Sequence, residues 1–282
     1  MITLTESQMQ GWLAAYLWPF VRIAACLTAA PIFGAHFVPV RLRIVLALAI
    51  TLLATPLLPP PPPVAVFSVA GVLITAQQVL LGVALGFVLQ VVFDAVGLGG
   101  QLLANSMGLS FAFNVDPMRG ASTPAVGQFY LLLITMTFVS LNGHLAFLDL
   151  VVRGFATLPV GEHGLGTDGA WMVLTFAGNL FSGAVQVALP GMTALLVVNL
   201  AFGVMSRAAP TLNLFAVGFP ITLVFGLLIV VVGLPAVQSG FAALAGQALE
   251  AVAARRPAHA SHRARRAQRG RRRFHSPRRR SA

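Results

Sequence analysis

Long runs of apolar residues alternate with short polar stretches along most of the chain. Each run is near or beyond the ~20 residues that a membrane-spanning helix needs. The runs cover residues 11–33, 40–58, 64–93, 125–147, 171–206 and 212–236. This pattern predicts an all-α, polytopic integral membrane protein with about six to seven hydrophobic helices.

Proline and small polar residues mark the expected breaks between the runs. Pro59 to Pro63 form an unbroken string, which cannot be helical because each ring removes a backbone donor. We expect this string to be a short polyproline-type connector. The run 171–206 is too long for one helix, and Pro190 divides it, so it predicts either one kinked helix or a hairpin of two short spans. Residues 94–124 and 153–170 are the longest polar stretches and are expected to be loops.

The composition supports membrane insertion and separates a basic tail from the rest of the chain. Only 9% of the residues are charged, against roughly 25% in a soluble domain. Residues 1–254 hold six Arg and seven acidic residues, a net charge of 6 − 7 = −1, whereas residues 255–282 hold twelve Arg and no acid. We therefore expect a membrane-embedded helical domain over 1–254 and a disordered Arg-rich tail over 255–282.

Charge placement gives a topology that conflicts with the number of runs. The tail should stay cytoplasmic by the positive-inside rule, where it would contact anionic lipid headgroups rather than nucleic acid. Arg41 and Arg43 should also be cytoplasmic, which places the N-terminus outside and requires an odd number of crossings. Six runs are visible, and splitting one at Pro190 gives seven but leaves Arg207 outside.

The residues offer little for catalysis. The chain contains no Lys, so it has neither a P-loop nor a Schiff-base lysine. Its single cysteine, Cys26, excludes an internal disulfide and a cysteine-based metal site. No two His residues have metal-ligand spacing, and the seven carboxylates are scattered. We expect no catalytic residue, no cofactor and no metal site.

Several polar and small residues inside the apolar runs are candidates for helix packing or partner contact. Arg22 lies in the first run, where it either meets a partner or pore, or reaches a carbonyl at a helix end. Gln90 and Asp94 share one helical face, which favours hydrogen bonds to a neighbouring subunit over an ion path. Gly82 and Gly86 form a GxxxG pattern that allows close helix approach within or between chains.

The segment from Met107 to Pro117 is apolar and aromatic, yet Gly-flanked and ended by a helix-breaking Asp-Pro pair. It is too short to span a membrane and too apolar for an exposed loop. Non-helical backbone at membrane depth occurs only where it lines a cavity or is buried in protein. The segment therefore predicts a re-entrant or plug loop, with an interfacial turn as the alternative. The residues proposed for the plug are Met107, Gly108, Leu109, Phe111, Phe113, Asp116 and Pro117.

A colinear series of motifs over about residues 10–240 resembles the flagellar export-gate family FliR. The individual motifs are short, and their order carries the resemblance. They are Trp18-Pro19-Phe20-Val21-Arg22, Ala30-Pro31-Ile32, Val38-Pro39 with Arg41 and Arg43, Gln77-Gln78, Leu81-Gly82, Leu85-Gly86, Met107 to Phe111 with Asp116-Pro117, FVSLNGH from Phe138 to His144, Ala188-Leu189-Pro190, Asn199 to Arg207, Ala209-Pro210, Leu212-Asn213 and FAVGFP from Phe215 to Pro220.

The resemblance implies a structural and gating subunit of a type III protein-export channel in the bacterial inner membrane, at the flagellar basal body. It implies assembly with the P and Q gate subunits (FliP and FliQ) and the export-switch subunit FlhB, and passage of unfolded flagellar proteins. The resemblance also implies that the helices sit unconventionally in the assembly, which offers a reason for the conflict between charge placement and the number of apolar runs. Packing or partner contacts are implied for Arg22, Gly82, Gly86, Gln90, Asp94, Arg207, Pro210 and Pro220.

Three other functions stay open at this point. The homologous T subunit of virulence injectisomes shares the fold, although the Gly218-Phe219-Pro220 ending favours the flagellar branch. A small-molecule or ion transporter would use Asp94 and Gln90. A membrane-tethered nucleic-acid binder would use the tail, and nothing in the resemblance extends to residues 255–282.

Overall fold

The helices of the protein follow the apolar runs. The computed structural model describes residues 5–109, 125–161, 164–208 and 214–253, so the Arg-rich tail lies outside the described residues. All regular elements in these ranges are helical. They are α1 (Glu6–Ala29), α2 (Val40–Ala54), the short 3-10 helix η1 (Thr55–Leu57), α3 (Val69–Ser106), α5 (Ala125–Ser140), α6 (Gly143–Thr157), α7 (Thr167–Ala177), α8 (Asn179–Ala208) and α9 (Leu214–Ala253).

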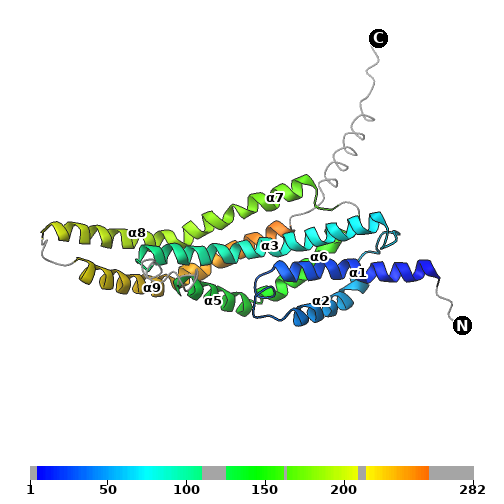
Figure 1. Ribbon diagram of the computed structural model, residues 1–282, viewed down its shortest axis with the longest axis horizontal. Coiled ribbons are helices and arrows are strands. Elements are labelled where there is room, and N and C mark those ends of the chain that lie inside the picture. The colour runs from blue at the N-terminus through cyan, green and yellow to red at the C-terminus, as the bar shows by residue number, and fades with distance from the viewer. Residues whose placement is uncertain (1–4, 110–124, 162–163, 209–213, 254–282) are drawn as a thin grey trace, which may run out of the picture.

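Helix α3 is the axis of an elongated bundle (Figure 1). Its most extensive contacts are with α1 and α8, followed by α5 and α9. More than half of its 38 residues are buried, whereas α2 and α8 bury small parts of their surfaces. Three aromatic rings meet edge to face where α3, α5 and α9 converge: Phe93 lies 5.5 Å from Phe138 and 5.2 Å from Phe241, centre to centre.

Both ends of α3 are closed by local hydrogen bonds. At the start, the Ser68 hydroxyl accepts a hydrogen bond from the Gly71 N–H at 3.1 Å, which satisfies one free donor of the first turn. At the end, the Leu109 N–H donates to the Ala104 carbonyl and the Gly108 N–H donates to the Asn105 carbonyl. Gly108 has a φ of +81°. These features make a Schellman motif, in which glycine supplies the left-handed residue.

The first half of α3 packs directly against the backbone of α1. A Cβ atom on Gly82 would overlap the Arg22 carbonyl oxygen, and one on Gly86 would lie 2.5 Å from the Cys26 carbonyl oxygen. Only glycine leaves room for this approach, so the GxxxG pattern serves packing within the chain.

The second half of α3 corrects the expectation that residues 94–124 form a loop, because the helix continues to Ser106. Its glycines are used for packing. Gly99 lies against the Ala184 carbonyl and Val187 of α8, and Gly100 lies against the Gly127 backbone of α5. The polar, glycine-rich composition of this segment therefore reflects close helix contacts. The predicted loop 153–170 is also shorter than expected, since α6 extends to Thr157.

Helices α5 and α6 form a bent pair. They meet at 68° across a break at Leu141 and Asn142. Asn142 has a φ of +55°, a left-handed conformation that asparagine adopts more readily than most residues. A Cβ atom on Gly143 would lie 2.5 Å from the Phe138 ring, so the tight bend requires glycine there.

The long run 171–206 does not form a hairpin at Pro190, which was one of the two predicted alternatives. Helix α8 continues through Pro190, and the chain instead breaks at Gly178 between α7 and α8. Proline removes one backbone hydrogen bond, but a single loss does not end this helix. The hairpin at Pro190 was therefore wrong, and α7 with α8 forms one stretch of 41 residues long enough to cross a membrane. Helix α9 likewise continues through Pro220 and Pro235.

By length and hydropathy, five helical stretches among the described residues can cross a membrane, or six if the bent α5–α6 pair counts as one span. The fold is thus that of an all-α, polytopic membrane protein, as the apolar runs predicted.

The first prediction concerns the α1–α3 contact. Gly82→Ala should lower the stability of the detergent-purified chain by about 1–3 kcal/mol, because the added methyl group meets backbone atoms. The matched control is Gly240→Ala in α9, where nothing lies within 4 Å of a new Cβ atom. That variant should be neutral or slightly stabilising. Thermal unfolding in detergent measures the stability of both variants. Equal stability of the two would contradict a backbone contact at Gly82.

Candidate subunit-contact and gate site

Arg22 joins three parts of the chain inside the bundle. Its side chain is 1% exposed. The Nε–H donates to Gln78 Oε1 at 2.7 Å, and Nη1 donates to the Leu158 carbonyl oxygen at 2.8 Å. The guanidinium carbon lies 4.1 Å from the centre of the Phe155 ring. Arg22 of α1 therefore binds α3 and the segment that follows α6, which is the helix-end carbonyl alternative raised from the sequence.

The buried charge of Arg22 has neutral partners. Within the part of the chain that the structure describes, it forms no salt bridge. Arg22 Nη2 and Gln78 Nε2 are both buried donors without a hydrogen-bond partner among these residues. The cation–π contact with Phe155 and two carbonyl acceptors offset part of the desolvation of the guanidinium.

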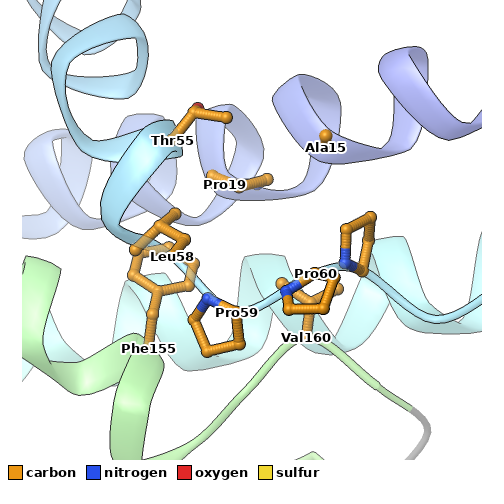
Figure 2. A pocket seen from close by; sticks show the side chains of 9 residues that line it. Ala15, Pro19, Thr55, Leu58, Pro59, Pro60, Phe155 and Val160 are labelled. Carbon is orange, nitrogen blue, oxygen red and sulfur yellow. The ribbon is translucent and has the colours of Figure 1, made fainter.

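A cleft of about 250 Å³ lies beside this cluster. Figure 2 shows Pro19 and Ala15 of α1 along one side, Thr55 and Leu58 of the α2–η1 end, and Pro59 and Pro60 across from Phe155 and Val160. The proline connector thus forms one wall, and Phe155 contacts both the cleft and Arg22. The lining is almost entirely apolar, which suits packing and offers no group for chemistry.

The partners of Arg22 within the chain were not predicted from the sequence. Gln78 precedes Gly82 and Gly86 at four-residue spacing, so one face of α3 carries the whole α1 contact. Trp18 extends that contact, since its Nε1–H donates to Thr75 Oγ1 at 3.1 Å. The spacing of Gln78 from the GxxxG pattern was a usable signal. Phe155 and Leu158 are more than 130 positions from Arg22 in sequence, and no sequence signal indicated that they contact it.

Gln90 and Asp94 lie on a different face of α3. Gln90 Nε2 donates to Asp94 Oδ1 at 2.9 Å, as their four-residue spacing predicted. Asp94 is exposed and Gln90 is half-buried. Neither residue contacts Arg22, so the structure does not bring the candidate polar residues into one site.

The start of the predicted plug segment is anchored to the bundle. Met107 is fully buried and occupies the space beside Gly226 of α9. Gly108 ends α3, and Leu109 packs against the main core. The other proposed plug residues, Phe111, Phe113, Asp116 and Pro117, lie outside the described residues.

The remaining candidates are near the α8–α9 connection. Arg207 is exposed in the last turn of α8, where its charge complements the helix dipole. Pro220 is exposed inside α9. Pro210 lies outside the described residues. Close by, Thr222 Oγ1 donates to the Gly218 carbonyl oxygen at 2.9 Å and lies 3.4 Å from Asn199 Oδ1 of α8.

Nothing in this arrangement resembles a catalytic centre. No group of three or more His, Cys, Asp or Glu among the described residues could hold a metal ion. The exposed Asp149 is paired with Arg153 at 2.7 Å on the outer face of α6. The fold and its polar contacts define a membrane protein of long helices with few polar groups, some of which connect one helix to another, as Arg22 and Trp18 do.

Comparison with known proteins places the chain in a family. Residues 13–248 match the model of the bacterial export proteins, family 1. This range contains nearly every helix of the bundle, and the chain belongs to this family.

Relatives in the same family have the name flagellar biosynthetic protein FliR. The chain is 40% identical to that of Escherichia coli strain K12 over 228 residues, which is 80% of this chain and 87% of the relative. It is 40% identical to that of Pectobacterium carotovorum over 229 residues, 81% and 87% of the two chains. With that of Bacillus subtilis strain 168 it shares 28% identity over 221 residues, 77% and 85%. The resemblance drawn from the motifs is confirmed.

The second prediction tests the geometry of Arg22 while keeping its charge. Arg22→Lys should destabilise the purified chain by about 1–3 kcal/mol, because one ammonium group cannot reach Gln78 and Leu158 together or stack as well on Phe155. Arg153→Lys, on the exposed α6 pair, should change stability by less than about 0.5 kcal/mol. Thermal unfolding of both variants in the same detergent is the measurement. If the Arg22→Lys chain were as stable as the Arg153→Lys chain, the contacts of Arg22 with Gln78, Leu158 and Phe155 would not hold these helices together.

Proposed function

We propose that this chain is a structural and gating subunit of the flagellar type III protein-export channel, needed for export of rod, hook and filament subunits. The observation that supports this most strongly is the family match over residues 13–248, joined by relatives named for flagellar biosynthesis. The scattered carboxylates and the apolar cleft favour a non-catalytic part of a channel.

The proposed partners are the P and Q gate subunits and the export-switch subunit, in one hetero-oligomeric complex of the inner membrane. The exposed apolar surfaces of α2, α8 and α9 support such an assembly. Large side chains on these helices are more than half exposed in the single chain, including Leu53 of α2, Leu196 of α8 and Val232 of α9. In a membrane assembly, lipid or neighbouring helices would cover them.

We place the tail in the cytoplasm. Its twelve Arg residues support this position by the positive-inside rule. The sixth candidate, the α5–α6 pair, carries the exposed Asp149–Arg153 ion pair on its outer face, and such a face is costly in lipid. The α5–α6 pair nevertheless runs back along α3, because Gly127 near its start lies beside Gly100 and Leu158 at its end bonds the same Arg22 that bonds Gln78. We therefore count it as a sixth crossing, which places the start of α1 on the same side as the tail and Arg41 and Arg43 on the opposite side.

The gating role is assigned to the segment that begins at Met107. Its start is fixed by the Schellman motif at Gly108 and by Met107 against α9. A segment that is apolar, short and held at one end suits a plug of a protein-conducting pore.

The third prediction tests this plug. Shortening residues 108–115 should leave the complex assembled but leaky, because the closure would be lost while the helices still pack. Membrane conductance or uptake of a small dye by cells expressing the full gate measures the leak. As a matched control, an equal shortening within residues 255–282 should leave the membrane tight. A tight membrane with the shortened plug would contradict the assignment.

Two other functions are distinguishable from the proposal. An injectisome subunit would be needed for effector secretion and dispensable for flagella. A transporter centred on Asp94 would move solute as the purified chain alone and would fail when Asp94 becomes Asn. The export subunit should move nothing by itself.

The fourth prediction tests the proposed function as a whole. A clean in-frame deletion should abolish swimming and hook-protein secretion, because the export channel cannot form. Expression of the intact gene should restore both, and deletion of residues 255–282 alone should leave motility largely intact. Normal flagella and normal secretion in the deletion strain would refute the flagellar assignment.

A further inference from the structure

One face of α3 stays uncovered along the length of the bundle. Residues at three- and four-residue spacing on this face are exposed or half-buried, while nearly all other residues of the helix between 81 and 104 are buried. In the first half they are Leu80, Val83 and Phe87, and in the second half they are Gln90, Asp94, Leu98, Gln101 and Asn105. We call the second group the polar stripe.

The other faces of α3 have partners within the chain. Helix α1 covers the face with Gly82 and Gly86, α8 covers Gly99, and α5 covers Gly97 and Gly100. Figure 1 shows α3 between α8 on one side and α1 and α5 on the other. The polar stripe faces away from most of these contacts, and only Gln101 borders α5, where its side chain lies beside Gly127.

The polar groups of the stripe lack partners of complementary charge. The Asp94 carboxylate accepts a hydrogen bond from Gln90, and no salt bridge to it occurs within the described ranges. The side chains of Gln101 and Asn105 form no hydrogen bond to the described residues. Asp94 lies near the centre of a helix apolar enough to span a membrane. An ionised carboxylate there is unfavourable towards lipid, so protein or water must meet it.

We propose that the polar stripe is an intersubunit surface, which is covered in the assembled complex by a membrane helix of a second subunit. That helix brings a cationic or amide donor side chain to Asp94. Charge supports this occupant: the stripe presents one carboxylate and amide oxygens at four- and seven-residue intervals, the spacing of one side of a packed helix. The inference rests on the proposed function, because it requires the chain to work in a complex.

The apolar half of the same face supports a helix as the occupant rather than a water-filled path. Leu80, Val83 and Phe87 continue the stripe without a polar group, and an aqueous path along α3 would have to wet these side chains. A second helix satisfies both halves, with side-chain packing against Phe87 and hydrogen bonds at Asp94.

Photo-crosslinking in the assembled complex tests the proposal. The photoreactive residue p-benzoylphenylalanine is placed at Leu98 in the full chain, which is expressed with the other gate subunits, and membranes are irradiated before purification. The expected product is an adduct with a gate subunit, identified by mass spectrometry. Its yield at Leu98 should fall about threefold or more in the Asp94→Leu background, given the strength of interhelical hydrogen bonds in membranes.

The matched control is Asp149→Leu, which removes the exposed carboxylate that is paired with Arg153 in its own chain. It should leave the yield at Leu98 unchanged. Adducts only within the chain, adducts only with lipid, no adduct, or a yield indifferent to Asp94→Leu would each overturn the proposal. This outcome can be told apart from failure of the proposed function. If the strain swims but no adduct forms at Leu98, the intersubunit surface is refuted and the export function is not.

Discussion

The backbone contact between α1 and α3 is the constraint on which the rest of the structure depends. Gly82 and Gly86 let the two helices approach so closely that any side chain at these two positions would overlap the backbone carbonyl groups of Arg22 and Cys26. At this separation Arg22 has no route to solvent, and its guanidinium must find acceptors inside the bundle. Gln78 and Leu158 provide them, and Phe155 covers the charge. The position of the α6 end is thereby tied to the first helix.

The same physical device recurs along α3, with a consequence for assembly. Gly99 and Gly100 bring α8 and α5 close in the second half, so glycines let three neighbouring helices approach α3. The fourth face keeps Gln90 and Asp94. Apolar contact alone contributes little free energy to helix association in lipid, because lipid is equally apolar. Polar side chains that stay exposed on α3 therefore determine where another subunit can bind.

Apolar periodicity was sufficient to predict the fold class and the starts of most helices, because lipid demands long uninterrupted runs. It failed at residues 94–106, where glycine and polar residues are signs of close packing rather than a loop. It left two alternatives at Pro190, and only the hairpin was wrong, since one missing hydrogen bond does not end a helix supported by its neighbours. Gly82, Gly86 and the Gln90–Asp94 pair were predictable from spacing. Arg22's contact with Leu158 was not, because it joins residues 136 positions apart.

The most direct measurement compares the reactivity of one cysteine on α3 in the isolated chain and in the assembled complex. The native Cys26 is buried, so Asn105→Cys reports with little background when a water-soluble maleimide is added. We expect the maleimide to label the purified chain rapidly. Once the other gate subunits are present, the cysteine should be strongly protected from labelling, because a second helix covers this face. Equal labelling in both states would contradict the view that α3 is the shared axis of the chain and of its assembly.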